Sequence, residues 1–359
     1  MNVKGRATGV MAIKKIANHG ITHPFGDHRS VNQAFPSGIP SKESDPFLMC
    51  DYFDMPESQG KARHADDFPI GWHPHRGMDI ASYLKSGKGR HGDSLGNRET
   101  FSTPGMQWMS VGSGVEHAEG GGNEEGEVMQ GFQIWINVPS QHKMDDPDYG
   151  TVANEEMPIV DIGDNQNGSR ARILAGEAVG ATNIVGPFRT KQPVQMIDLE
   201  LQENDAFEFE IADGLDTAML YVYEGALSRA NGAGSESDTH PSPLDDGTIL
   251  LLDADDAKRR RISLATTRDQ TAGVMLFAGK KLKEQIAWHG PIVMNTQEQI
   301  YDTFMEMRMG DFPPKRVSWD YKKWKSKPDG WEGTAPSGNC DASAKEEKKE
   351  ETIPKETIS

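Results

Sequence analysis

The segment GFQIWINV, at Gly131–Val138, gives the clearest indication of the fold class. Its apolar residues Phe132, Ile134 and Ile136 alternate with Gln133 and Trp135. Successive side chains of an extended chain point to opposite faces, so this alternation predicts a β-strand with one buried face.

Similar short runs lie on both sides of this segment. They are separated by turn residues, and the chain contains 38 Gly and 21 Pro. Strands at such even spacing are typical of a sandwich or barrel. We therefore expect an all-β protein with strands at 46–53, 78–84, 107–111, 197–201, 207–211, 219–223, 248–252 and 274–277, and a polar hairpin loop at 92–97.

The length of 359 residues suggests two domains or one large one. We expect an N-terminal arm at 1–45, a first barrel at 46–150 and a second barrel with a helix at 170–312. The acidic, loop-rich stretch at 140–170 separates the two barrels. Residues 313–359 form an extension whose end we expect to be disordered, because it is a run of charged residues.

One helix is well marked, at 296–309. Asn295 can cap its first turn, with Glu298 as the partner in a capping box, and Gly310 can end it. Ile300, Phe304 and Met307 fall on one face of such a helix. A polar stretch at 229–247, with an acidic insert at 234–247, has no assigned role, and neither has the extension.

The composition limits the partners. A net charge of −17 disfavours direct binding to nucleic acid but not to a protein partner. We find neither a secretory signal nor an apolar stretch that could span a membrane. Two distant cysteines, Cys50 and Cys340, fit a reducing compartment. We therefore expect a cytoplasmic monomer that is not secreted. Lys258–Arg261 could mark nuclear import, although a solvated turn is the more common origin of such a fragment.

Histidine placement is the most informative feature for function. Nine of the eleven histidines lie at or before His142. His73 and His75 stand two residues apart, as do His117 and Glu119, and alternate residues of a strand share a face. Two such pairs on facing strands would place three imidazoles and one carboxylate around one ion. This set suits Fe(II) first, with Mn, Ni, Cu or Zn as alternatives.

A single His-x-His pair is also found as surface polar residues in a strand. We interpret His64, His91 and His142 as solvated or ordinary polar positions. His19, His23 and His28 are too irregularly spaced for a designed site. Pro74 and several nearby glycines distinguish the two paired motifs from these.

Five segments together resemble the pirin family. They occur in order between residues 45 and 312 and are Gly71–Asp79 (GWHPHRGMD), Gln107–Glu119 (QWMSVGSGVEHAE), Gly131–Asn137 (GFQIWIN), Arg172–Glu177 (RILAGE) and His289–Thr296 (HGPIVMNT). The resemblance implies a bicupin, two tandem cupin barrels packed face to face. It also implies that only the first barrel holds iron, with His73, His75, His117 and Glu119 as ligands.

Some pirins resemble quercetin 2,3-dioxygenases, and mammalian pirin resembles an iron-dependent nuclear co-regulator of Rel-type transcription factors. The first likeness implies a small aromatic, flavonol-like substrate and dioxygen, with Glu119 accepting the substrate's hydroxyl proton. The second implies a redox-gated interaction module without turnover. A structural metal is a third interpretation. We favour the oxygenase.

The chain departs from the family at a few positions. Asp79 stands where pirins usually carry Glu, and Met78 stands where they carry an aromatic residue. The turn at Thr103–Met106 is one residue shorter than the family's Pro-Gly-Asp pattern. None of these positions is a metal ligand in the family, so we expect the ligand set to be retained and its surroundings to differ.

Overall fold

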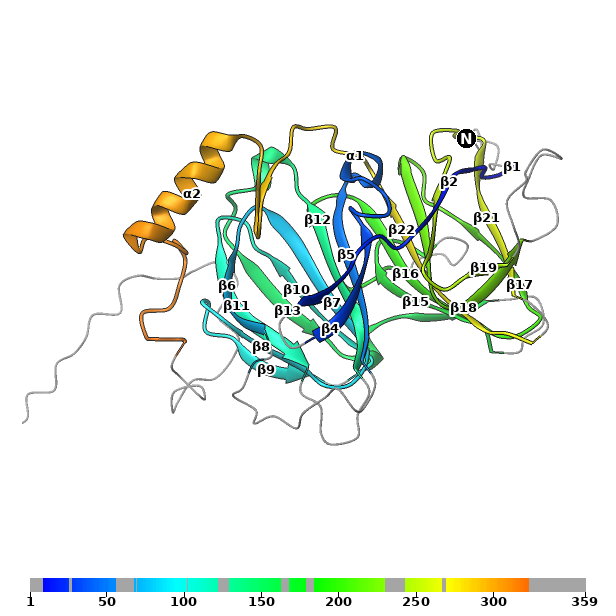
Figure 1. Ribbon diagram of the computed structural model, residues 1–359, viewed down its shortest axis with the longest axis horizontal. Helices are drawn as coiled ribbons and strands as arrows, with labels where there is room; N and C mark the ends of the chain where they lie inside the picture. Colours follow the sequence, from blue (N-terminus) through cyan, green and yellow to red (C-terminus); the bar gives the residue numbers. More distant parts are fainter. Residues whose placement is uncertain are drawn as a thin grey trace, which may run out of the picture.

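The computed structural model describes residues 9–25, 28–55, 68, 70–101, 103–121, 129–162, 168–178, 184–229, 243–266 and 269–322. These residues form mostly β-strands, arranged as two domains side by side (Figure 1). The all-β prediction is confirmed. In the described part of the chain, no helix is long and apolar enough to cross a membrane.

Two sheets build the first barrel. The seven-stranded sheet runs β13-β10-β7-β12-β5-β4-β3. Its strands are β3 (Thr22–Phe25), β4 (His28–Phe35), β5 (Phe47–Met55), β7 (Met78–Ser86), β10 (Gly105–Ser110), β12 (Met129–Asn137) and β13 (Asp148–Val152). The four-stranded sheet runs β6-β11-β8-β9, from β6 (Ile70–His75), β8 (Gly89–Asp93), β9 (Arg98–Phe101) and β11 (Val115–Gly121).

The second barrel is formed by an eleven-stranded sheet whose main path is β1-β21-β18-β22-β16-β15-β14. Its strands are β1 (Gly9–Val10), β2 (Ile13–Asn18), β14 (Ile159–Asp161), β15 (Arg170–Ala175), β16 (Val194–Leu201), β17 (Ala206–Glu210), β18 (Thr217–Arg229), β19 (Leu244–Asp245), β20 (Thr248–Leu252), β21 (Arg259–Thr266) and β22 (Ala272–Gly279). The chain passes from one barrel to the other between β13 and β14, within the predicted junction.

Strand β12 is buried on both faces rather than on one. Phe132, Ile134 and Ile136 belong to a core cluster that also contains residues of the second barrel, such as Met219 and Phe277. The opposite face of β12 looks into the first barrel. The two barrels therefore pack against each other through sheet faces, which is why the alternating strand has no face left for solvent.

The first and the last elements of the described chain each lie with the barrel that is farther away in the sequence. Strands β1 and β2, from the predicted N-terminal arm, pair with β21 and β20 of the second barrel. The hairpin β23 (Ala287–His289) and β24 (Ile292–Met294) and the helix α2 (Gln297–Met309) lie beside the first barrel (Figure 1). Its position in the sequence predicts this helix in the second domain, but its hydrogen bonds to Arg76 attach it to the first barrel. A short helix α1 (Ser41–Ser44) precedes β5.

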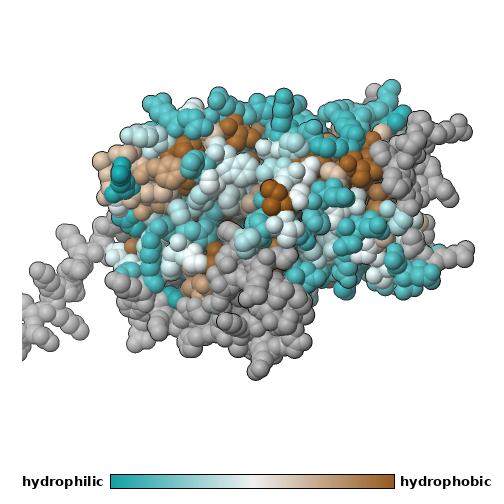
Figure 2. Space-filling view, viewed as in Figure 1, coloured by the Kyte–Doolittle hydropathy of each residue, from teal (hydrophilic) through white to brown (hydrophobic). Residues whose placement is uncertain are grey.

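The cap of α2 differs from the predicted one. Thr296, not Asn295, accepts the hydrogen bond from the backbone of Gln299, whose side chain completes the capping box. Gly310 ends the helix with φ of 81°, as expected. Phe304 is exposed, and Thr303 is buried instead. Figure 2 shows a mostly hydrophilic face, with hydrophobic residues gathered in small areas, one of them over α2.

The basic fragment Lys258–Arg261 is not a solvated turn throughout. It leads into β21, and the Arg260 side chain is buried, donating to the backbone carbonyls of Ala254 and Leu215 at 2.9 and 2.8 Å. A buried guanidinium of this kind holds the loops around it together. Most of the predicted insert (230–242) and the end of the extension (323–359) lie outside the described residues.

Candidate metal centre

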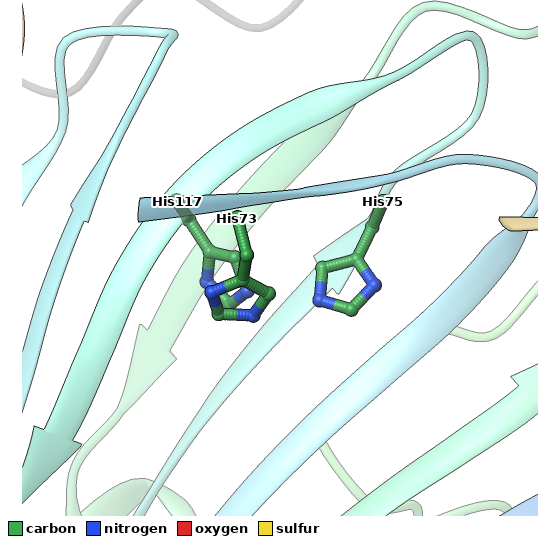
Figure 3. Close-up of side chains that lie close together, drawn as sticks. All are labelled: His73, His75 and His117. Atoms are coloured by element: carbon green, nitrogen blue, oxygen red, sulfur yellow. The ribbon is translucent and has the colours of Figure 1, made fainter. Parts of the chain in front are cut away.

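Three histidines meet on the four-stranded sheet of the first barrel. His73 and His75 lie on β6, and His117 lies opposite His73 on the antiparallel neighbour β11. Figure 3 shows the three imidazoles pointing to the same side of these strands. Their ligand atoms lie within 4.8 Å of one another, and the ring centroids are 4.3 to 4.9 Å apart.

The chemistry of this cluster fits a transition metal. Both ring nitrogens of His75 and both of His117 are buried and have no hydrogen-bond partner. Leaving buried polar atoms without partners is costly, at about 1–3 kcal/mol each. A bound cation would satisfy one nitrogen of each ring, which explains why the fold tolerates them.

The ionisation of the cluster favours the same role. Burial lowers the pKa of His75 well below its usual value, and the neighbouring His73 lowers it further. Burial also lowers the pKa of His117, followed by the charges of His73 and His75. Both rings are therefore neutral near pH 7, and neutral imidazole is the form that binds metals.

The orientation of His73 is fixed by its own strand. Its Nδ1 donates to the carbonyl of Gly71 at 2.7 Å, so the lone pair of Nε2 is left for a ligand. His75 packs its ring edge against Trp135, with centroids 5.1 Å apart.

Glu119 lies next to the three histidines but not within their group. Its Oε1 is 4.0 Å from Nε2 of His117. Gln133 Nε2 donates to Oε1 at 3.0 Å, and Gln107 Nε2 donates to Oε2 at 2.6 Å. The Ser82 hydroxyl donates to Oε2 at 3.1 Å. Glu119 as a fourth ligand therefore stays a prediction, and its carboxylate is held in one place by three donors.

A cavity of about 160 Å³ opens beside the cluster. His73, His75 and Glu119 line it together with Ser82, Gln107 and Gln133. The rest of its wall is mostly apolar, from Val31, Met49, Phe53, Leu84, Phe101 and Met129. A small organic molecule could therefore lie against the histidines with one polar and one apolar side.

His91 was wrongly interpreted as an ordinary polar position. It is fully buried, and its Nε2 donates to Oδ2 of Asp93 at 3.0 Å. Its ring stacks on Tyr149, with centroids 4.1 Å apart, and lies 5.5 Å from the ring of His117. The side of His117 away from His73 is therefore packed against a second, firmly held imidazole. The His91-Gly92-Asp93 spacing, with polar residues two positions apart, was the signal in the sequence.

The strand that carries two of the histidines is held from outside the barrel by Arg76. Its Nε donates to the Ser113 carbonyl at 2.7 Å, and its Nη1 donates to Thr303 of α2 at 2.9 Å. Nη2 pairs with Glu306, and the guanidinium lies over the Phe312 ring. The chain after the second barrel thus returns to fix the end of β6.

The remaining histidines lie apart from the cluster. His142 is partly exposed and pairs with Asp145 at 2.8 Å, as an ordinary polar residue does. His23, on β3, lines the same cavity as His73 and His75 but does not belong to their group. His64 and the side chain of His28 lie outside the described residues.

Comparison with protein families finds two matches. The family model described as pirin matches residues 28–136, and the one described as the pirin C-terminal cupin domain matches residues 196–313. Together they span most of both barrels and confirm the predicted bicupin architecture.

Known proteins of similar sequence and structure agree. A protein of Pseudomonas aeruginosa named "Putative quercetin 2,3-dioxygenase" is 32% identical over 293 residues, which are 80% of this chain and 94% of the relative. A crystal structure of quercetin 2,3-dioxygenase from Acinetobacter baumannii has a TM-score of 0.72 at 26% identity, covering 85% of this chain and 99% of the other.

A bacterial pirin from Escherichia coli, solved in complex with nickel(II), has a TM-score of 0.52 at 18% identity. It covers 74% of this chain and 99% of the other. At that identity the likeness shows the fold alone.

Proposed function

Because this chain belongs to the pirin family, we propose that it is a mononuclear metal-dependent dioxygenase of the quercetin 2,3-dioxygenase type. The observation that carries the proposal is the cluster of His73, His75 and His117 beside a cavity, which His73 and His75 line. The name of the relative from Pseudomonas aeruginosa suggests the reaction class.

Under this proposal His73, His75 and His117 hold one divalent transition metal, Fe(II) first. Imidazole ligands also suit Ni, Cu and Zn, and Mn is a further alternative if the Glu119 carboxylate is a ligand. The bound ion supplies Lewis acidity, which lowers the pKa of a hydroxyl group that it contacts. With three histidine ligands, coordination positions remain for a substrate.

Glu119 is the proton acceptor in this proposal. Its two oxygens are held by Gln133, Gln107 and Ser82 beside the cluster. A general base has to come within about 2.6–3.2 Å of the proton that it takes. A flavonol whose 3-hydroxyl faces the histidines would bring that hydroxyl next to this carboxylate.

The apolar wall of the cavity provides the remaining contribution. Side chains such as Phe101 and Leu84 can pack on an aromatic ring and exclude water from it. The flavonol anion reacts there with dioxygen, its heterocycle opens, and the products are a phenolic ester and carbon monoxide. Both oxygen atoms end in these products, so no further reductant is needed.

The experiment is aerobic incubation of metal-loaded protein with quercetin. The flavonol absorbance should disappear together with an equal amount of dioxygen. Glu119→Gln should lower the rate at least about 100-fold, since general base catalysis contributes about 10²–10⁴. Glu116→Gln is the matched control, because Glu116 pairs with Tyr321 and Lys322 outside the cavity. A wild type that holds metal and consumes no quercetin would refute the proposal for this substrate.

A further inference from the structure

A row of polar residues crosses the floor of the cavity. On five neighbouring strands, residues directly opposite one another all line it: Gln33 on β4, Asp51 on β5, Gln133 on β12, Ser82 on β7 and Gln107 on β10. Neighbouring strands lie about 4.8 Å apart, so the row spans roughly 19 Å. It reaches well beyond the histidine cluster.

Three residues of this row form hydrogen bonds with Glu119. Gln107, Ser82 and Gln133 all donate to Glu119, next to the histidines. The row is interrupted between Gln133 and Asp51, since no hydrogen bond joins these two side chains in the described structure. Asp51 is oriented the other way, and its Oδ1 accepts from Gln33 Nε2 at 3.1 Å.

At the far end of the row, Asp51 and His23 face each other in a long contact. Oδ2 of Asp51 lies 3.5 Å from Nε2 of His23. The Nδ1 of His23 lies 3.1 Å from the Pro24 carbonyl, to which it can only donate. Nε2 of His23 is buried and makes no regular hydrogen bond. A hydroxyl group of a ligand can donate its proton to Oδ2 of Asp51 and accept from Nε2 of His23 when that nitrogen carries a proton.

The size of the cavity places this pair at the outer end of a bound ligand. A cavity of about 150 Å³ holds a benzene molecule, so about 160 Å³ encloses roughly one aromatic ring. A ligand with two ring systems has to extend from the buried histidines towards solvent. The His23 side chain is 28% exposed, so the cavity reaches solvent at this end.

We propose that Asp51 and His23 form a second subsite, which binds a hydroxyl group on the ring of the substrate farthest from the histidine cluster. The preferred substrates are then planar polyphenols with hydroxyl groups at both ends. This inference rests on the proposed function for the orientation of the ligand. The second subsite would distinguish flavonols with hydroxyl groups on the outer ring from those without them, which the histidine cluster alone cannot do.

The test compares two ligands by binding. Dissociation constants are measured by calorimetry, without dioxygen, for quercetin and for the flavonol that lacks both hydroxyls of its outer ring. Metal content is checked for every variant. A hydrogen bond to a charged acceptor changes affinity by about tenfold or more. Wild-type protein should therefore prefer quercetin about tenfold.

Two substitutions at Asp51 and one control locate the preference. Asp51→Leu should reduce the tenfold ratio to about one, and Asp51→Asn, which keeps one acceptor, should give an intermediate ratio. If Asp51→Leu fails to fold, Asp51→Asn still gives the answer. Asp54→Asn makes the same change at an exposed position of the same strand and should keep the wild-type ratio. Unchanged ratios in the folded Asp51 variants would overturn the subsite.

The outcomes separate this subsite from the proposed reaction. A tenfold binding preference without dioxygen uptake would support the subsite and count against the reaction. Turnover of both flavonols with equal affinities would support the reaction and overturn the subsite. If neither flavonol binds to metal-loaded protein, the subsite for polyphenols is rejected as well.

Discussion

The two barrels of this chain have related architectures and different interiors. The first contains a cavity of about 160 Å³, lined by histidines, amides and a carboxylate. The second is filled by a continuous apolar cluster that includes Leu199, Leu220 and Phe207, and a pocket beside its strands measures only about 30 Å³. One barrel packs its interior for stability, whereas the other keeps it open for a ligand.

This difference lies in side chains, not in topology. In the first barrel, β12 places Gln133 and Trp135 towards the cavity. In the second barrel, every residue of β22 is buried, and its Val274 and Leu276 belong to the apolar cluster. A fold does not determine a function, and only the barrel with convergent polar groups can carry chemistry. Substitutions that change one barrel and leave the other intact therefore test this contrast.

The largest expected effect is the loss of metal from the first barrel. His75→Ala removes one of the three ligands and should lower metal affinity by more than about 100-fold, beyond the 10–100-fold typical of groups behind the ligands. His289→Ala, an exposed position on β23, should bind as wild type does. Titration with Fe(II), Ni(II) and Zn(II) measures both.

The same variant distinguishes a functional metal from a structural one. In the described structure no other side chain forms a hydrogen bond with His75, so His75→Ala should keep its circular dichroism spectrum and cooperative unfolding. If the variant were unfolded, the metal would have a structural role.

Stability should depend on the filled barrel more than on the hollow one. Leu199→Ala removes a side chain that is 1% exposed within the apolar cluster and should cost about 2–5 kcal/mol. Ile70→Ala changes a partly exposed residue at the cavity wall and should cost less than about 1.5 kcal/mol. Urea denaturation gives both values, and equal losses would contradict the contrast.

A pH-dependent term is expected where the barrels join. Asp79 is buried, accepts from Ser110 at 2.7 Å and from the backbone N–H of Lys191 at 2.9 Å, and burial raises its pKa to about 6. The folded state then holds a proton that the unfolded state, with a usual pKa of 3.8, has lost. Folding stability from this group is present below about pH 4 and declines as the pH rises to about 6, by roughly 3 kcal/mol.

Asp79→Asn mimics the protonated form and should remove this decline. Unfolding free energies of the wild type and the variant, measured between pH 4 and 7, should diverge in favour of the variant as the pH increases. Parallel curves would show that the carboxyl is not buried as described.

The smallest expected effect concerns the residue behind His117. His91→Phe keeps a ring on Tyr149 but loses the hydrogen bond to Asp93. Metal affinity should fall by about tenfold, the lower end for groups that orient ligands. His142→Phe, at a partly exposed position, is the control. If His91→Phe bound metal with the affinity of the wild type, the contact of His91 with His117 would not position His117.

Much of the fold could be predicted because apolar and polar residues alternate along many strands, and this alternation indicates which face of a strand is buried. Two features could not be predicted in this way. The pairing of β1 and β2 with the second barrel depends on tertiary contacts, since strands of two and six residues carry no mark of their partners. The helix start was displaced by one residue because Asn295 and Thr296 both fit a capping box, with Glu298 and Gln299 respectively.

The candidate site was predictable to the extent that it is local. His73 and His75 share a face because of their spacing, and the structure places His117 opposite them. The row from Gln33 to Gln107 was not predictable, because its members come from five strands and meet only through sheet register. The spacing of His91 and Asp93 indicates that the two side chains can pair, but it does not reveal that they are buried.

The central claim is that the three histidines of the first barrel share one ion. The most direct test is a crystal structure of protein loaded with a single metal, with diffraction recorded on both sides of that metal's absorption edge. We expect one anomalous peak at roughly 2.0–2.2 Å from a nitrogen of each of His73, His75 and His117. A peak bound elsewhere, or none at these rings in protein of verified metal content, would contradict the claim.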